Sequence, residues 1–169
     1  MQKVGFGGSC HWCTEAIFRS LVGVVTVEQG WISSNGANAE PSEAVLVSFE
    51  ESDISLQTLI VIHLYTHSCT ADHSMRGKYR SAVYSFSDKQ VQEATAAIRV
   101  LQAEFEQPII TKVLPFETFR LNDEAYLDYY YKDPSKPFCQ NIVNPKLKEL
   151  LRRFKKHISP ERQGHLSGL

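Results

Sequence analysis

The chain has 169 residues, 43% of them hydrophobic and 22% charged, and a formal net charge of −1. This length is typical of one domain with a sizeable core, so we expect a single domain over residues 1–169. The near-neutral charge gives no reason to expect nucleic acid or an anionic membrane surface as a partner. No apolar stretch approaches the roughly 20 residues that span a bilayer. Four cysteines and no visible secretory leader favour a reducing compartment, and we expect the cytoplasm.

Short runs of alternating or β-branched residues predict strands. They cover residues 3–6, 24–29, 43–49 and 80–86, and residues 109–119 supply one or two more. Glycine, serine and asparagine in residues 30–41 predict a loop between two of these strands. Residues 67–78 are polar and irregular.

Helices are predicted where apolar residues recur every three or four positions. The clearest are residues 55–66, with Ser55 as N-cap, and residues 88–107, which Pro108 would end. A helix is also expected from Cys10 onwards. Weaker helical segments cover residues 123–131 and 145–157, with a proline-containing loop at 132–138 between them.

The order of these elements favours a two-layer α+β sandwich, with helices on one face of a mixed sheet and a helical C-terminal extension. The β-α-β-β-α-β core predicts a ferredoxin-like plait. The basic cluster at residues 152–156 lies at the end of the last predicted helix, where cations complement the helix dipole, so we interpret it as a solvated helix end. Residues 159–169 lack an apolar period and are expected to form a flexible tail.

The most informative segment is residues 7–17, GGSCHWCTEAI. Two glycines after a predicted strand allow a sharp turn, and Cys10 and Cys13 follow on the first turn of a predicted helix. The free N–H groups of a helix start stabilise a negative charge and lower the pKa of a thiol. A thiolate is a nucleophile, so the segment indicates redox or nucleophilic cysteine chemistry.

The C-x-x-C spacing of Cys10 and Cys13 alone fits a redox pair, half of a zinc site or two unrelated thiols. A zinc site needs two further ligands at defined spacing, and the other cysteines and histidines follow none of the usual patterns, so we expect no metal. A thioredoxin-like fold also places a C-x-x-C after a strand, but its second βαβ half is not matched here. An inert, buried Cys10 is disfavoured because the glycines bring it to a surface turn.

Residues 5–24, GFGGSCHWCTEAIFRSLVGV, resemble the catalytic segment of class A peptide methionine sulfoxide reductases, where Gly-Cys-Phe-Trp precedes the active-site helix. Further motifs of that family follow in the same order. They are Gly30-Trp31, Ser42-Glu43-Ala44-Val45, Ile62-His63, Lys78-Tyr79-Arg80-Ser81, Pro137-Phe138-Cys139-Gln140 and Asn144-Pro145-Lys146. The resemblance runs from about residue 4 to residue 155, and its ordered motifs argue against coincidence.

The resemblance implies a catalytic domain that reduces methionine-S-sulfoxide, peptide-bound or free, in protein repair under oxidative stress. Cys10 would attack the sulfoxide sulfur and become a sulfenic acid as methionine leaves. Glu43 would protonate the sulfoxide oxygen, which requires a carboxyl that holds a proton at neutral pH, as burial favours. Tyr79 would hydrogen-bond that oxygen, and Trp12 would form a wall of the methyl pocket. Without the resemblance, Glu43 would be interpreted as an exposed charge, Tyr79 as a half-buried strand residue and Trp12 as a core residue.

The family then resolves the sulfenic acid with a second thiol, and thioredoxin, or dithiothreitol in the test tube, reduces the disulfide. No cofactor is implied, the substrates are oxidised proteins, peptides or free methionine sulfoxide, and we expect a monomer. Cys139 lies at the family's C-terminal resolving position, and Cys13, one helical turn from Cys10, competes with it. We favour Cys139 because its predicted loop is mobile. Cys69 has no functional counterpart in the family.

The sequence departs from the family at positions expected to bind substrate. His11 replaces a phenylalanine beside Cys10 and could pair with its thiolate. Trp31 replaces a tyrosine, and its indole donates one hydrogen bond but accepts none. Ser74 stands where the family has an aspartate, and the loop over residues 30–43 is shorter. These changes predict a divergent member with an altered substrate preference.

Two other functions remain open. The first is a non-enzymatic redox sensor, in which a disulfide between Cys10 and Cys13 changes a surface. The second is a reductase of another small sulfoxide on the same scaffold.

Overall fold

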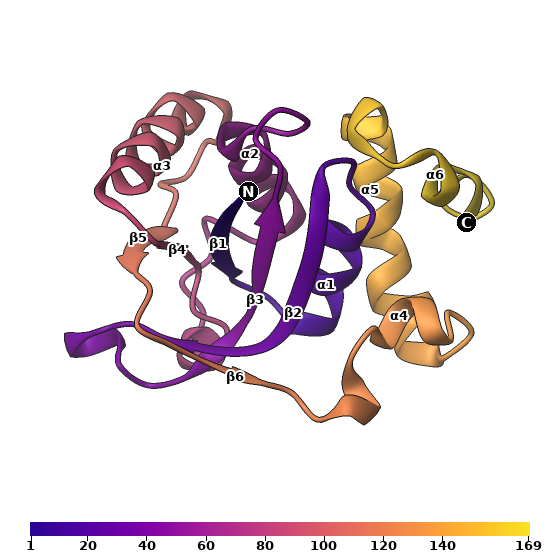
Figure 1. Ribbon diagram of the computed structural model, residues 1–169, viewed down its shortest axis with the longest axis horizontal. Helices are drawn as coiled ribbons and strands as arrows, with labels where there is room; N and C mark the ends of the chain where they lie inside the picture. Colours follow the sequence, from indigo (N-terminus) through magenta and orange to yellow (C-terminus); the bar gives the residue numbers. More distant parts are fainter.

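The structure is a computed structural model that describes residues 1–169, and its centre is a six-stranded sheet with the order β5-β4-β1-β3-β2-β6 (Figure 1). The β4–β5 pair is parallel and all other neighbouring strands are antiparallel. The strands are β1 (Gln2–Gly7), β2 (Val24–Ser33), β3 (Ser42–Phe49), β4 (Ala82–Ser85), β5 (Lys112–Pro115) and β6 (Thr118–Leu121).

Six α-helices accompany the sheet; α2 begins at the predicted Ser55 cap, and α3 begins at the predicted Asp88 after a Ser87 cap but ends at Leu101, before the predicted Gln107. Ser55 Oγ accepts a hydrogen bond from the Thr58 N–H, and Ser87 Oγ from the Gln90 N–H. The helices are α1 (His11–Arg19), α2 (Leu56–Thr66), α3 (Asp88–Leu101), α4 (Tyr129–Lys132), α5 (Asn144–Phe154) and α6 (Pro160–Ser167). None of them is long and apolar enough to cross a membrane.

The first six elements, β1-α1-β2-β3-α2-β4, form the ferredoxin-like plait that the sequence predicts. Their strands have the order β4-β1-β3-β2, and β5 and β6 extend the sheet at its two edges. Helices α5 and α6 follow as the helical C-terminal extension (Figure 1). The α+β class and the mixed sheet are therefore confirmed.

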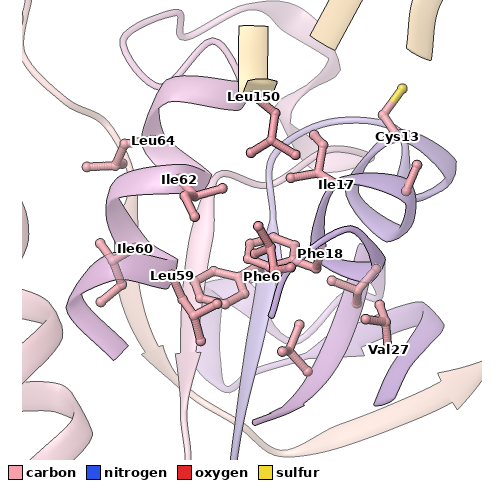
Figure 2. Close-up of a cluster of buried hydrophobic side chains, with 14 of the residues drawn as sticks. Phe6, Cys13, Ile17, Phe18, Val27, Leu59, Ile60, Ile62, Leu64 and Leu150 are labelled. Atoms are coloured by element: carbon pink, nitrogen blue, oxygen red, sulfur yellow. The ribbon is translucent and has the colours of Figure 1, made fainter. Parts of the chain in front are cut away.

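The larger core lies between the sheet and helices α1, α2 and α5 (Figure 2). Phe6 of β1 stacks on Phe18 of α1 with ring centroids 4.7 Å apart, and Ile62 and Leu150 come from α2 and α5 (Figure 2). Successive residues of a strand face opposite sides, so Gly5 faces a smaller cluster instead. There a Cβ on Gly5 would lie 2.7 Å from Ile32 Cδ1, which is why this position admits only glycine.

Strand β2 is longer than predicted and continues through residues that the sequence assigned to a loop. β6 pairs with its far end, and this pairing keeps residues up to Ser33 extended. Trp31 therefore lies in a strand, opposite Glu43 of β3 and Arg120 of β6. The sequence did not reveal this because the partner strand is about 90 residues away in the chain.

The prediction of a flexible tail at residues 159–169 is wrong, because residues Pro160–Ser167 form α6. Leu166 is 1% exposed within the main core, and the Tyr130 hydroxyl lies 2.6 Å from His165 Nε2. One buried leucine and one tertiary hydrogen bond order this helix without an apolar period, so its stability comes from packing rather than from its own sequence pattern.

Candidate active site

The turn that precedes Cys10 is held by hydrogen bonds to both glycine carbonyls. His63 Nε2 donates to the Gly7 carbonyl over 2.8 Å, and Arg76 Nη1 donates to the Gly8 carbonyl over 2.8 Å. Gly8 has a φ of +148°, and a Cβ there would lie 2.5 Å from the His67 ring. Only glycine suits this backbone, which delivers Cys10 to the N-cap of α1.

The structure distinguishes the two cysteines of the motif electrostatically. The pKa of Cys10 is lowered, mainly by a hydrogen bond from the Cys13 thiol and further by the N–H groups of Trp12 and Cys13. Burial and the charge of Glu43 oppose this shift. The pKa of Cys13 is raised, first by its hydrogen bond to Cys10 and then by burial. Of the two thiols, Cys10 therefore ionises more readily, and Cys13 is the thiol that stabilises its charged form.

This hydrogen bond predicts how Cys10 reacts with iodoacetamide. Replacing Cys13 by alanine removes a donor to a charged group, worth about 1.5–3 kcal/mol, so alkylation of Cys10 at pH 7 should slow roughly tenfold. The Cys13→Ser variant keeps a donor and should stay within about threefold of the parent rate. Peptide-resolved mass spectrometry measures alkylation of Cys10 alone. Equal rates in all three proteins would show that the Cys13 thiol does not stabilise the Cys10 thiolate.

A pocket of about 400 Å³ opens over Cys10. Of the residues singled out by the sequence, Cys10, Cys13 and Tyr79 line it. Several other residues line the pocket that the sequence did not single out as site residues, although Gly8, Ser9, Phe138 and Lys146 lie in the motifs that carry the resemblance. These are Gly8, Ser9, Ser68, His73, Met75, Phe138, Ile142 and Lys146.

Glu43 lies beside Cys10 but outside this pocket lining. It is the second residue of β3, is 6% exposed, and its charge acts on Cys10. Its Oε1 accepts a hydrogen bond from the His11 backbone N–H over 3.1 Å, and Lys78 Nζ lies 3.6 Å from its Oε2. The exposed strand-edge position that the residue type alone suggests is thus wrong, since the start of α1 covers this carboxylate.

His11 turns away from the thiolate that it was expected to pair with. Its Nδ1 lies 2.7 Å from the Gly30 carbonyl, its Nε2 lies 3.4 Å from Glu43 Oε1, and its ring meets Trp31 edge-on at 5.1 Å. Trp31 in turn carries the Arg120 guanidinium over its face at 4.1 Å. Both ring nitrogens of His11 therefore face groups other than Cys10, so the structure gives no support to the ion pair that the sequence allowed.

Ser74 is exposed and does not line the pocket, although the residues on either side of it, His73 and Met75, do. It lies in the 3₁₀ turn Ser74–Gly77, which directs its neighbours toward Cys10 instead. The turn that the sequence selected therefore borders the pocket, but through the neighbours of Ser74.

The family model for peptide methionine sulfoxide reductase matches residues 2–158. The chain belongs to this family. Curated relatives named peptide methionine sulfoxide reductase MsrA agree with that assignment. The protein from Trichodesmium erythraeum is 31% identical over 94% of this chain and 99% of its own length. The protein from Acinetobacter baumannii strain SDF is 30% identical over 91% of this chain and 96% of its own length.

Solved structures of methionine sulfoxide reductases share the fold. Mxr1 from Saccharomyces cerevisiae in its reduced form matches with a TM-score of 0.74 and 21% identity, over 82% of this chain and 88% of that one. The methionine sulfoxide reductase A of Corynebacterium diphtheriae matches with a TM-score of 0.67 and 21% identity, over 79% of this chain and 75% of that one. A structure of Mxr1 in complex with Trx2 also matches this chain. The TM-score is 0.60 and the identity 20%, over 76% of this chain and 84% of the matched chain.

Trp12, the tryptophan of the reductase motif, lies in an aromatic stack behind the pocket. Its ring packs face to face on Tyr129, with centroids 3.9 Å apart, and edge-on against Phe138, which does line the pocket. The buried Glu15 carboxylate holds this stack in place, because it accepts hydrogen bonds from the backbone N–H groups of Asp128 and Tyr129. Trp12 thus contacts the pocket through Phe138.

Cys139 is not in a mobile loop, contrary to the sequence-based expectation. It is 0% exposed and begins a π-helical turn, Cys139–Val143, that leads directly into α5. An ionised Cys139 would raise the pKa of Cys13 through its charge. The two thiols therefore lie near each other. Val143 and Leu147 are also fully buried and anchor this turn in the core. Mobility therefore no longer favours Cys139 over Cys13.

Two buried histidines behind the glycine turn predict an acid-labile fold. His63 and His67 stack with centroids 4.1 Å apart, and burial lowers both pKa values, that of His67 to about 3. A lowered pKa means that the folded protein prefers the neutral ring. Stability is therefore complete above the unfolded pKa near 6.5 and is lost as the pH falls from there toward 3.

The free energy of unfolding should fall by at most about 1.4 kcal/mol per pH unit for each histidine. Thermal unfolding between pH 7 and 4 measures it. The His67→Gln variant, which retains an acceptor for the Ser81 hydroxyl, should show a flatter decline than the parent protein. The His73→Gln variant removes an exposed histidine and should follow the parent curve. A decline unchanged by His67→Gln would refute this assignment.

No group of three or more His, Cys, Asp or Glu side chains is arranged to hold a metal ion. All four cysteines are free thiols.

Proposed function

We propose that this protein reduces the S epimer of methionine sulfoxide, in oxidised proteins and peptides or as the free amino acid. Its membership of the peptide methionine sulfoxide reductase family supports this reaction. The single observation that carries it is a thiol with a lowered pKa at a helix start, Cys10, next to an open pocket and a buried carboxylate.

The reaction requires a nucleophile for sulfur and an acid for oxygen. The Cys10 thiolate attacks the sulfoxide sulfur, the S–O bond breaks, and the oxygen passes to Cys10 with one proton from Glu43. Cys10 becomes a sulfenic acid and is oxidised by two electrons, while the substrate sulfur is reduced by two electrons to the thioether of methionine. Tyr79, half-buried in the pocket wall, donates its hydroxyl proton in a hydrogen bond to the same oxygen.

We propose that Cys13 attacks the sulfenic acid, because its thiol lies one helical turn from Cys10 and lowers the pKa of Cys10. That attack forms a disulfide and releases water. Lys146 lines the same pocket, and its charge offsets part of the rise in the pKa of Cys13. Cys139 lies behind Cys13 and is the second candidate. Mass spectrometry after one turnover without reductant identifies the pair, and we expect Cys10 linked to Cys13.

Thioredoxin is the proposed reductant for this disulfide. The related fold of Mxr1 has been solved in complex with Trx2, a thioredoxin, and this supports a similar encounter here. Free thiols throughout the chain fit a monomer that works in a reducing compartment such as the cytoplasm.

Epimer-resolved turnover of a methionine sulfoxide derivative, with dithiothreitol as reductant, tests the proposal. The expected result is complete loss of the S epimer with the R epimer untouched. Turnover of the R epimer alone, or of neither epimer, would refute it. Repeating the assay with thioredoxin, thioredoxin reductase and NADPH tests the physiological reductant separately.

A further inference from the structure

The ladder between β1 and β4 stops short of both Cys10 and Tyr79. Its last pair joins Gly7 to Ala82 in antiparallel register. Cys10 follows Gly7 by three residues and Tyr79 precedes Ala82 by three, so the same register carried onward would place the thiol opposite the tyrosine. No ladder hydrogen bond joins these two residues, so their spacing depends on other contacts.

One guanidinium, that of Arg76, joins the two segments beyond the end of this ladder. Arg76 Nη1 donates to the Gly8 carbonyl over 2.8 Å and to the Tyr79 carbonyl over 2.9 Å. The two carbonyls therefore converge on a single nitrogen atom. One belongs to the turn before Cys10, and the other to a residue that lines the pocket.

The remaining hydrogen bonds of Arg76 fix the guanidinium itself. Its Nε donates to the Ala71 carbonyl over 2.8 Å, and its Nη2 donates to the Ser68 carbonyl over 2.6 Å. All four acceptors are backbone oxygens, and a guanidinium offers its N–H groups in one rigid plane. A planar donor with four fixed acceptors cannot move toward one carbonyl without losing another. The spacing of the Gly8 and Tyr79 carbonyls is therefore fixed by Arg76.

The segment around Tyr79 is also tied to Glu43. The Lys78 carbonyl accepts a hydrogen bond from the Glu43 backbone N–H over 2.9 Å and another from Ser42 Oγ over 2.9 Å. This segment therefore connects the strand that carries the carboxylate with Arg76 and, through Arg76, with the turn before the thiol.

We propose that Arg76 is a positioning residue for the reduction of methionine-S-sulfoxide, because it sets the spacing between Cys10 and Tyr79. The inference rests on the proposed reductase function, in which the thiol attacks the sulfoxide sulfur and the tyrosine hydroxyl holds the oxygen. One bond joins that sulfur to that oxygen, so both contacts form together only at one spacing of the two side chains. Arg76 does not line the pocket over Cys10, so it acts through the backbone and not on the substrate.

This role differs from activation of the nucleophile. The main causes that lower the pKa of Cys10 are the Cys13 thiol and the N–H groups of Trp12 and Cys13, all of them in α1. Loss of Arg76 should therefore disturb the alignment of Cys10 with Tyr79 while the thiol still ionises. The alkylation rate of Cys10 reports ionisation alone, and the rate of sulfoxide reduction reports both.

A double-mutant cycle between Arg76→Ala and Tyr79→Phe tests the proposal. Single-turnover formation of methionine is measured at saturating methionine-S-sulfoxide in the parent, the two single variants and the double variant. Tyr79→Phe removes one donor to the oxygen and should cost about 10²-fold in the parent. Arg76→Ala should cost about 10²-fold by misalignment.

The expected result is that the two losses do not multiply. Once Arg76→Ala has removed the alignment, Tyr79→Phe should cost less than about tenfold, because its hydroxyl no longer meets the oxygen in the reacting complex. Alkylation of Cys10 by iodoacetamide should stay within about threefold of the parent rate in all four proteins.

Arg99→Ala is the matched control, because Arg99 is exposed on α3 and makes none of these contacts. In that background Tyr79→Phe should keep its full cost. If Arg76→Ala does not fold, Arg76→Lys takes its place in the cycle, since an ammonium keeps the charge but lacks the planar arrangement of donors.

Losses that multiply in the cycle would show that Arg76 only stabilises the protein, and would overturn the proposal. A full rate in Arg76→Ala would overturn it as well. So would a fall in alkylation equal to the fall in turnover, since Arg76 would then act on the ionisation of Cys10. Failure of the parent protein to reduce methionine-S-sulfoxide would instead refute the proposed function itself.

Discussion

Replacing Cys10 by serine is expected to abolish reduction of methionine-S-sulfoxide. A serine hydroxyl is un-ionised at neutral pH and cannot take up the oxygen as a stable acid, so neither the attack nor the oxygen transfer has a substitute. Removal of the nucleophile from a site that acts as a unit costs at least about 10⁴-fold in turnover. The assay is single-turnover formation of methionine, which needs no resolving thiol.

The variant Cys69→Ala is the matched control. Cys69 is buried and does not line the pocket, and burial raises the pKa of its thiol, so we expect it to be unreactive. Its replacement should leave the single-turnover rate within about twofold of the parent. Residual turnover in Cys10→Ser above a few per cent would mean that another thiol is the nucleophile.

Replacing Glu43 by glutamine should lower the single-turnover rate by about 10²–10³-fold while Cys10 remains reactive. The amide preserves the shape and still accepts the His11 backbone N–H, but it delivers no proton, and loss of a general acid has this magnitude. Alkylation of Cys10 should become slightly faster, because the negative charge of Glu43 opposes formation of the thiolate. The two readouts therefore move in opposite directions.

Glu106→Gln provides the comparison for a carboxylate on the surface, since that side chain is exposed and takes part in no ion pair. It should change neither the turnover nor the alkylation rate. If Glu43→Gln lowered both rates together, its effect would come from a disturbed turn around Cys10 rather than from a missing proton, and Glu43 would lose its proposed role.

Local chemistry made much of this fold predictable. The serine caps of α2 and α3, the glycine turn before Cys10 and the alternation of Val4 and Phe6 all depend on residues within a few positions of each other. The order β4-β1-β3-β2 then follows from how few ways such a chain of strands and helices can pack. These features are dictated by backbone sterics and by the period of apolar residues.

The features that the sequence did not predict depend on distant partners. The direction of the His11 ring is set by the Gly30 carbonyl, and the burial of Cys139 is set by a core shared with α1 and α5. Ser74 lies outside the pocket lining, while its neighbours His73 and Met75 line it, because one step along a 3₁₀ turn changes the direction of a side chain. Motifs thus identify which segments meet, but not which way each side chain faces after they meet.

The distribution of the four sulfur atoms over the surface and interior limits how an oxidant can damage this protein. Cys13, Cys69 and Cys139 are 1%, 2% and 0% exposed, and Cys10 alone is partly open to solvent. Peroxide that diffuses to the molecule therefore reaches first the one cysteine whose sulfenic form a neighbouring thiol can reverse. Irreversible sulfinic acid would accumulate only when oxidant arrives faster than Cys13 reacts. The burial that makes Cys13 a poor nucleophile in the resting protein thus also protects this thiol from oxidation, so that it remains available to react with the Cys10 sulfenic acid.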